Sequence, residues 1–132
     1  MGYLLDTDTI SAHLKQESAI AGFMLQYMGR VSVSAVTVGE LMTWALRRAA
    51  PAKRLIGVRQ LLGDLDILPV TPEIAEEYGR LRATLLDAGH PTPEMDLLIA
   101  ATAVHHDLVL VTHNVRHFAH IPGLTIEDWL TR

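Results

Sequence analysis

Short apolar runs alternate with longer stripes of helical spacing along this chain. The apolar runs predict buried strands at residues 3–5, 31–34, 67–68 and 108–111, and a further strand at the sheet edge at residues 124–126. Between them, apolar side chains recur three and four residues apart, which predicts helices at about residues 20–27, 38–49, 55–62, 74–85 and 93–106.

Strands separated by helices indicate an α/β fold with a parallel sheet and right-handed crossovers. Thr71-Pro72 and Thr92-Pro93 are expected to open helices, and Gly89 to close one. In such sheets, the carboxyl ends of the strands share one edge with the amino ends of the helices that follow them. Ligands usually bind at that edge, so its polar residues are the candidates for function.

Composition places the chain among ordinary globular domains. It has 132 residues, 49% of them apolar and 20% charged, and neither a linker nor an internal repeat is evident, which predicts a single domain over residues 1–132. Cysteine is absent, which excludes disulfides, thiolate zinc sites and cysteine nucleophiles and fits a reducing, cytoplasmic setting. The apolar runs are far shorter than a bilayer span, so we expect no membrane segment.

The net charge of −4 argues against a general nucleic-acid coat protein, whose affinity would come from phosphate neutralisation. The charge is unevenly distributed along the chain, because residues 47–59 contain five basic residues and no acidic residue. These are Arg47, Arg48, Lys53, Arg54 and Arg59.

Four polar residues map to the functional edge of the predicted sheet. Asp6 ends the first strand, Glu40 and Asp96 are expected in the first turns of helices, and Asn114 follows the fourth strand. Three carboxylates brought together repel one another, and each is pushed towards protonation. A hard divalent cation such as Mg²⁺ or Mn²⁺ relieves this repulsion and can activate water for attack on a phosphodiester.

Each of the four also has a purely structural interpretation. Asp6 could cap the next helix, and Glu40 could complete a capping box that Thr37 begins. Asp96 could complement a helix dipole, and Asn114 could be a turn residue. The functional hypothesis rests on the joint pattern, because independent caps have no reason to converge on one site.

Five stretches give the chain a family resemblance over almost its whole length: residues 3–8, 34–41, 96–103, 111–118 and 127–129. The chain resembles PIN-domain nucleases, and specifically the VapC toxins of bacterial and archaeal toxin–antitoxin pairs. The resemblance implies a PIN-like three-layer α/β/α fold with a short, mostly parallel central sheet of four to five strands.

The resemblance also implies a chemistry. It makes Asp6, Glu40 and Asp96 the acids of a Mg²⁺ or Mn²⁺ site, with Thr7 and Thr112 as their hydroxyl partners. The activity implied is that of an endoribonuclease that uses water as the nucleophile and leaves a 5′-phosphate and a 3′-hydroxyl.

Three positions depart from the family pattern. Asn114 stands where a fourth acid is common, which puts tight binding of a second metal in doubt. His117 occupies a position that is often acidic, and Asp8 stands where many relatives carry Asn or Ser. Asp8 is therefore either a helix cap or an extra acid near the site.

The resemblance further implies partners: an RNA substrate (transfer or ribosomal RNA), a cognate VapB-like antitoxin and a homodimer, with no membrane association. An acidic ribonuclease needs a local patch to hold RNA, and Arg47, Arg48 and Arg54 are the candidates. The alternative is that these arginines form a solvated helix face.

Three rival interpretations stay open at this point. Asp6-Thr7-Asp8 after a strand is similar to the nucleophile motif of haloacid-dehalogenase-like phosphatases, although Lys53 is the sole remote candidate for their lysine. A catalytically impaired PIN-like binding module is conceivable because the fourth acid is missing. Zinc binding is conceivable because His113, His117 and His120 are closely spaced.

Overall fold

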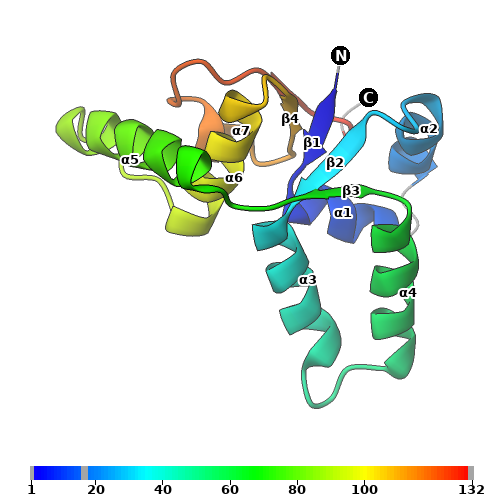
Figure 1. The fold of residues 1–132 in the computed structure, drawn as a ribbon. Helices are drawn as coiled ribbons and strands as arrows, with labels where there is room; N and C mark the ends of the chain where they lie inside the picture. The colour runs from blue at the N-terminus through cyan, green and yellow to red at the C-terminus, as the bar shows by residue number, and fades with distance from the viewer. Residues whose placement is uncertain (1, 16–17, 131–132) are drawn as a thin grey trace.

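The structure is a computed structural model that describes residues 2–15 and 18–130. Within these residues, five parallel strands form one sheet with helices on both faces (Figure 1). The strands are β1 (Tyr3–Leu5), β2 (Val31–Ser34), β3 (Asp66–Leu68), β4 (Val109–Val111) and β5 (Ile126–Glu127). The helices are α1 (Thr7–Leu14), α2 (Ser18–Gln26), α3 (Ala35–Leu46), α4 (Ala52–Gly63), α5 (Pro72–Asp87), α6 (Glu94–His105) and α7 (Val115–Phe118).

The α/β class and the parallel sheet predicted from the pattern are confirmed. The edge strand β5 begins two residues later than expected, and β3 forms the other edge. Helix α5 opens as Thr71-Pro72 predicts, because the Thr71 hydroxyl accepts a hydrogen bond from the Ile74 amide at 3.2 Å. Gly89 follows the end of α5 with a φ of 75°, the left-handed conformation that glycine adopts most readily.

The strand order β3-β2-β1-β4-β5 places β1 in the middle of the sheet. The chain builds outwards from β1 in one direction through β2 and β3, and then continues on the other side with β4 and β5. The topological switch therefore lies between β1 and β4, where the Asp6 amide donates to the Val111 carbonyl at 3.0 Å. Open α/β sheets bind ligands in the crevice at such a switch.

Alternation along β1 divides the interior into two layers. Tyr3 and Leu5 face a core formed with α1 to α4, in which Trp129 is also buried. Leu4 faces the other core, formed with α5, α6 and α7. This arrangement confirms the three-layer α/β/α architecture.

Helix α3 begins earlier than the sequence pattern suggests. Ser34 is its cap, and the Ser34 hydroxyl accepts from the Val36 amide at 3.1 Å. Thr37 therefore lies inside the helix, and Glu40 lies in the second turn rather than the first. The alternative interpretation of Glu40 as part of a capping box with Thr37 is wrong, because β2 runs directly into α3 and Ser34 is the cap.

None of the helices in the described parts of the chain is long and apolar enough to cross a bilayer. Helix α6 is instead the central helix of its layer, buried on most of its surface. Ala100, Ala101 and Ala103 are each fully buried, which lets α6 approach the sheet closely.

Because Ala101 is fully buried, Ala101→Leu is expected to destabilise the protein by roughly 1–3 kcal/mol through overpacking. The measurement is urea denaturation followed by circular dichroism. Ala83→Leu makes the same change at an exposed position of α5 and is the control. Equal free energies of unfolding for the two variants would contradict the close approach of α6.

Candidate active site

Asp6 lies directly after β1 at the switch point and is 4% exposed. Its Oδ1 accepts from the Thr9 amide at 2.9 Å, and its Oδ2 accepts from the Thr112 hydroxyl at 2.5 Å. Burial raises the pKa of Asp6, these hydrogen bonds oppose the rise, and the nearby charge of Asp8 adds to it. The carboxylate is thus fixed in position but costly to ionise.

Asp96 lies in the first turn of α6, as the sequence predicts. Its Oδ2 is 3.3 Å from Nδ1 of His117. Burial raises the pKa of Asp96, His117 lowers it, and Asp8 raises it again. Because Asp8 acts on both Asp6 and Asp96, the three acids share one electrostatic site at this edge of the sheet.

Glu40 joins the site through Thr7, the residue that follows Asp6. The Thr7 hydroxyl donates to Oε1 of Glu40 at 2.6 Å and lies 3.2 Å from the hydroxyl of Thr37. This contact links α3 to the start of α1 across 33 positions of sequence. Thr7 therefore orients Glu40, the role that the resemblance implies for it.

Asn114 also belongs to the site. Its side-chain amide donates to the carboxylate of Asp8, and its backbone amide donates to the Thr112 hydroxyl at 3.0 Å. Thr112 thus accepts from one site residue and donates to Asp6. The sequence left Asp8 open between a helix cap and an extra acid. The structure places it at the site, in the first turn of α1, while Asp6 is the cap.

The chemistry of these donors fits a hard divalent cation. The side-chain atoms near Asp6 that could bind a metal are carboxylate, hydroxyl and amide oxygens, the ligands that Mg²⁺ and Mn²⁺ prefer. The negative charge of Asp8 also disfavours ionisation of Asp6 and Asp96, and a cation would relieve this. Among the residues that the structure describes, no three His, Cys, Asp or Glu side chains are already drawn together as a complete metal cluster. The acids would have to close around an ion.

The three histidines considered for zinc have separate partners. His113 lies 3.1 Å from the carboxylate of Asp128, and His117 is paired with Asp96. The ring of His120 stacks on that of His90 with centroids 4.4 Å apart. The pairing of His117 with Asp96 had no counterpart in the sequence pattern, because the path of the loop after β4 decides it.

The basic segment divides into two parts in the structure. Arg47 and Arg48 are exposed where α3 ends. Arg54 is half-buried and its guanidinium carbon lies 4.7 Å from the centre of the Trp44 ring. The three arginines proposed as one patch therefore lie in different surroundings.

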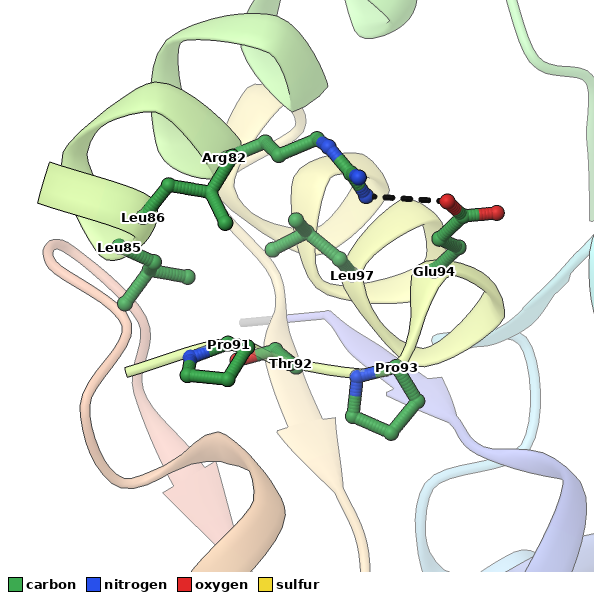
Figure 2. Close-up of a pocket in the computed structure, with 8 residues that line it drawn as sticks. All are labelled: Arg82, Leu85, Leu86, Pro91, Thr92, Pro93, Glu94 and Leu97. Atoms are coloured by element: carbon green, nitrogen blue, oxygen red, sulfur yellow. Dashed lines mark hydrogen bonds and ion pairs between the residues drawn. The ribbon is translucent and has the colours of Figure 1, made fainter. Parts of the chain in front are cut away.

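A separate hollow of about 230 Å³ lies between α5 and α6 (Figure 2). Figure 2 shows Arg82 reaching across it towards Glu94, and the two side chains are 3.1 Å apart. Pro91, Thr92 and Pro93 line its other side. This ion pair helps to hold the start of α6, two residues before Asp96.

Comparison with known proteins settles the family. The family model of the PIN domain matches residues 3–124 of this chain. The chain belongs to the PIN-domain family. A tRNA(fMet)-specific endonuclease VapC of Salmonella typhimurium is 35% identical to this chain over 129 residues. The alignment covers 96% of this chain and 97% of that protein. Ribonuclease VapC2 of Haemophilus influenzae is 32% identical over 129 residues, 97% and 98% of the two chains.

Solved structures agree. The crystal structure of a DNA-bound VapBC from Salmonella typhimurium matches this PIN domain with a TM-score of 0.94 at 33% identity, over 98% of each chain. The match over nearly the whole length favours the VapC resemblance and weighs against the haloacid-dehalogenase-like alternative for Asp6.

The raised pKa of Asp6 gives the PIN domain a defined pH dependence. The folded state holds the Asp6 proton more tightly than the unfolded state, so this group's contribution to stability is full below the unfolded pKa and is lost as pH rises through the folded pKa. Asp6→Asn is therefore expected to raise the Tm by a few degrees at about pH 7, and by less at about pH 4.

The measurement is thermal unfolding of the chelated protein at both pH values. Asp66→Asn, the same change on the exposed edge strand β3, is the control and should shift the Tm little. A gain for Asp6→Asn that grew towards acid pH would contradict the burial cost assigned to this carboxylate.

Proposed function

We propose that this PIN domain is a Mg²⁺- or Mn²⁺-dependent endoribonuclease that acts as the toxin of a VapBC-type pair in the cytoplasm. The observation that carries the proposal is that Asp6 and Asp96 lie near the same third acid, Asp8, at one edge of the sheet. They are 90 positions apart in the sequence, yet each has its pKa raised by burial and by the same neighbour, Asp8. Desolvated carboxylates that share a like-charged neighbour favour binding of a divalent cation.

The residues that would hold the cation are Asp6, Glu40 and Asp96. When bound, Mg²⁺ or Mn²⁺ supplies positive charge that makes water more acidic and stabilises charge on a phosphodiester. Asn114 offers a neutral oxygen in place of a fourth carboxylate, so its contribution to cation binding is weaker.

The remaining residues hold these acids in position. Thr112 and the Thr9 amide fix the two oxygens of Asp6, so that its carboxylate keeps one orientation. Thr7 aligns Glu40 through a 2.6 Å hydrogen bond. Side chains held by such contacts position reacting groups without a loss of entropy during the reaction.

The proposed substrate is RNA, with transfer RNA as the first candidate, because the Salmonella relative bears the name of a tRNA(fMet)-specific endonuclease. Ribosomal RNA is the alternative. Sequencing of RNA 5′ ends after brief expression, with Asp6→Ala as the background, identifies the cleaved molecule. The VapBC complexes among the structural neighbours support a cognate antitoxin as partner, and we expect a homodimer.

Asp6→Ala and Asp96→Ala are each expected to lower the rate of RNA cleavage at least about 100-fold, because each removes a carboxylate from the cation site. The measurement is cleavage of total tRNA by purified protein in Mg²⁺ or Mn²⁺, with growth inhibition on expression as a second readout. Asp66→Asn is the matched control and should cleave like the wild type.

Both variants should remain folded by circular dichroism. Cleavage at the wild-type rate in EDTA would refute the role of the metal. A wild-type protein that binds RNA but cleaves none in either cation would instead identify a catalytically impaired binding module.

Asn114→Asp tests the departure at the fourth acid position. The change replaces a donor to Asp8 with a like charge, so the chelated protein should unfold at a lower temperature. The added carboxylate should also raise the affinity for Mn²⁺ roughly tenfold, since ligand charge sets such affinities. Thermal unfolding and calorimetric Mn²⁺ titration measure the two effects.

The matched control is Asn114→Ala, which removes the same donor without adding charge. It should lower the Tm less than Asn114→Asp and leave Mn²⁺ affinity close to that of the wild type. Equal Mn²⁺ affinity in Asn114→Asp and Asn114→Ala would place residue 114 outside the cation site.

A further inference from the structure

A hollow of about 400 Å³ lies where α1, α3 and α4 come together, outside the acid site. We name it the cationic pocket. Its lining residues are Leu14, Lys15, Trp44, Lys53, Arg54 and Gly57. Three of these six side chains are positively charged at neutral pH, and none of the six is acidic.

The composition of the chain makes this gathering unusual. The sequence contains two lysines, and both line the cationic pocket although Lys15 follows α1 and Lys53 lies on α4. The chain as a whole carries a net charge of −4. Cations concentrated in one hollow of an acidic protein provide a local attraction for an anionic ligand that the overall charge does not.

An aromatic ring adds a second feature. The Arg54 guanidinium carbon lies 4.7 Å from the centre of the Trp44 ring, a cation–π contact, and both side chains are half-buried. A guanidinium held over an indole is pre-organised, and unpaired RNA bases stack on both aromatic rings and guanidinium planes. The pocket therefore combines charge for a phosphate with flat surfaces for a base.

The cationic pocket and the acid site lie along the same two helices. Trp44 comes four residues after Glu40 on α3, which places the two on one helix face about 6 Å apart along the axis. Lys15 follows the end of α1, the helix that Asp6 caps, about 13 Å along its axis. Figure 1 shows α3 and α4 as a hairpin extending away from the sheet, with α1 at its base.

We propose that the cationic pocket binds a phosphate and the adjoining base of the RNA strand next to the bond that the acid site cleaves. The inference rests on the proposed function, since it assigns the way in which that substrate is held. Lys15 and Lys53 neutralise the phosphate, while Trp44 and Arg54 provide the stacking surface. The pocket is thus a substrate-positioning subsite at short range from the acids.

An acidic protein segment would be attracted by the same charges. The Trp44–Arg54 cation–π pair favours RNA, because nucleobases gain from stacking on such groups and carboxylate side chains do not. Polyglutamate therefore serves as a competitor of like charge without bases.

The first experiment measures binding of a fluorescein-labelled single-stranded RNA of about 12 nucleotides in EDTA, across a range of salt concentrations. Lys15→Gln and Lys53→Gln should each weaken binding about three- to tenfold. Each should also reduce the slope of log K against log salt by about 0.7, the value for one phosphate contact on a single strand. Arg59→Gln, the same change at an exposed position of α4 outside the pocket, should have less than about a twofold effect.

The second experiment fills the pocket without changing its charge. A Cβ at Gly57 would lie 3.8 Å from Cδ2 of Leu14, an ordinary contact, so Gly57→Ala is the smaller change at this position and should weaken RNA binding less than Gly57→Leu. Gly57→Leu projects further into the hollow and should weaken binding at least about fivefold. Quenching of tryptophan fluorescence by the RNA should be lost in Trp44→Phe.

The inference is overturned if folded pocket variants bind RNA like the wild type, if Arg59→Gln weakens binding as much as Lys53→Gln, or if polyglutamate displaces RNA at equal charge concentration. Its failure is distinct from that of the proposed function. Loss of cleavage in Asp6→Ala with unaltered binding by the pocket variants would retain the nuclease and reject the subsite. If the wild type cleaves no RNA but its RNA binding depends on the pocket, the subsite would be retained and the nuclease rejected.

Discussion

Burial of the Asp6 carboxylate at the switch between β1 and β4 is the constraint on which the site depends. Strands β1 and β4 are paired up to Leu5 and Val111, and the Asp6 amide continues that pairing, so the Asp6 side chain is almost removed from solvent. The carboxylate is retained because the Thr9 amide and the Thr112 hydroxyl satisfy its two oxygens. Asp6 can therefore be a helix cap and a candidate site residue at the same time. One carboxylate oxygen caps α1, and the other accepts a hydrogen bond from Thr112 at the end of β4.

Topology explains why part of this site could be predicted from the sequence. In a parallel sheet every strand ends at the same edge, so Asp6 after β1 and Asn114 after β4 had to approach each other. Asp96 was predictable because the Thr92-Pro93 signal fixed the start of α6 to within a residue or two. Glu40 also lies near them, although α3 begins about one turn earlier than expected. Its side chain still contacts Thr7 at the start of α1.

Other parts of the site were beyond the sequence pattern. The contacts of Asp8 with Asn114 and of His117 with Asp96 depend on side-chain rotamers and on the short turn between β4 and α7. Helix α7 has four residues, too few to leave a periodic signal. Likewise, the sequence grouped Arg47, Arg48 and Arg54 as one basic patch. The rotation of α4 about its own axis decides which of its basic side chains face a neighbouring helix. That rotation depends on the packing of α4 against α1 and α3.

Helix α1 links the acid site to the cationic pocket, because Asp6 caps its start and Lys15 follows its end. The acids alone repel a phosphate, and the cations attract it. Lys15 lies about 13 Å along α1 from Asp6, beyond the Debye length of about 8 Å at physiological salt, so this attraction weakens as the salt concentration rises. A divalent cation among the acids removes the repulsion without altering the attraction. On the proposed function and subsite, RNA held in the pocket would bring phosphate oxygens near the acids, where they would favour the cation. Because linkage is reciprocal, substrate and cation would then each strengthen the binding of the other.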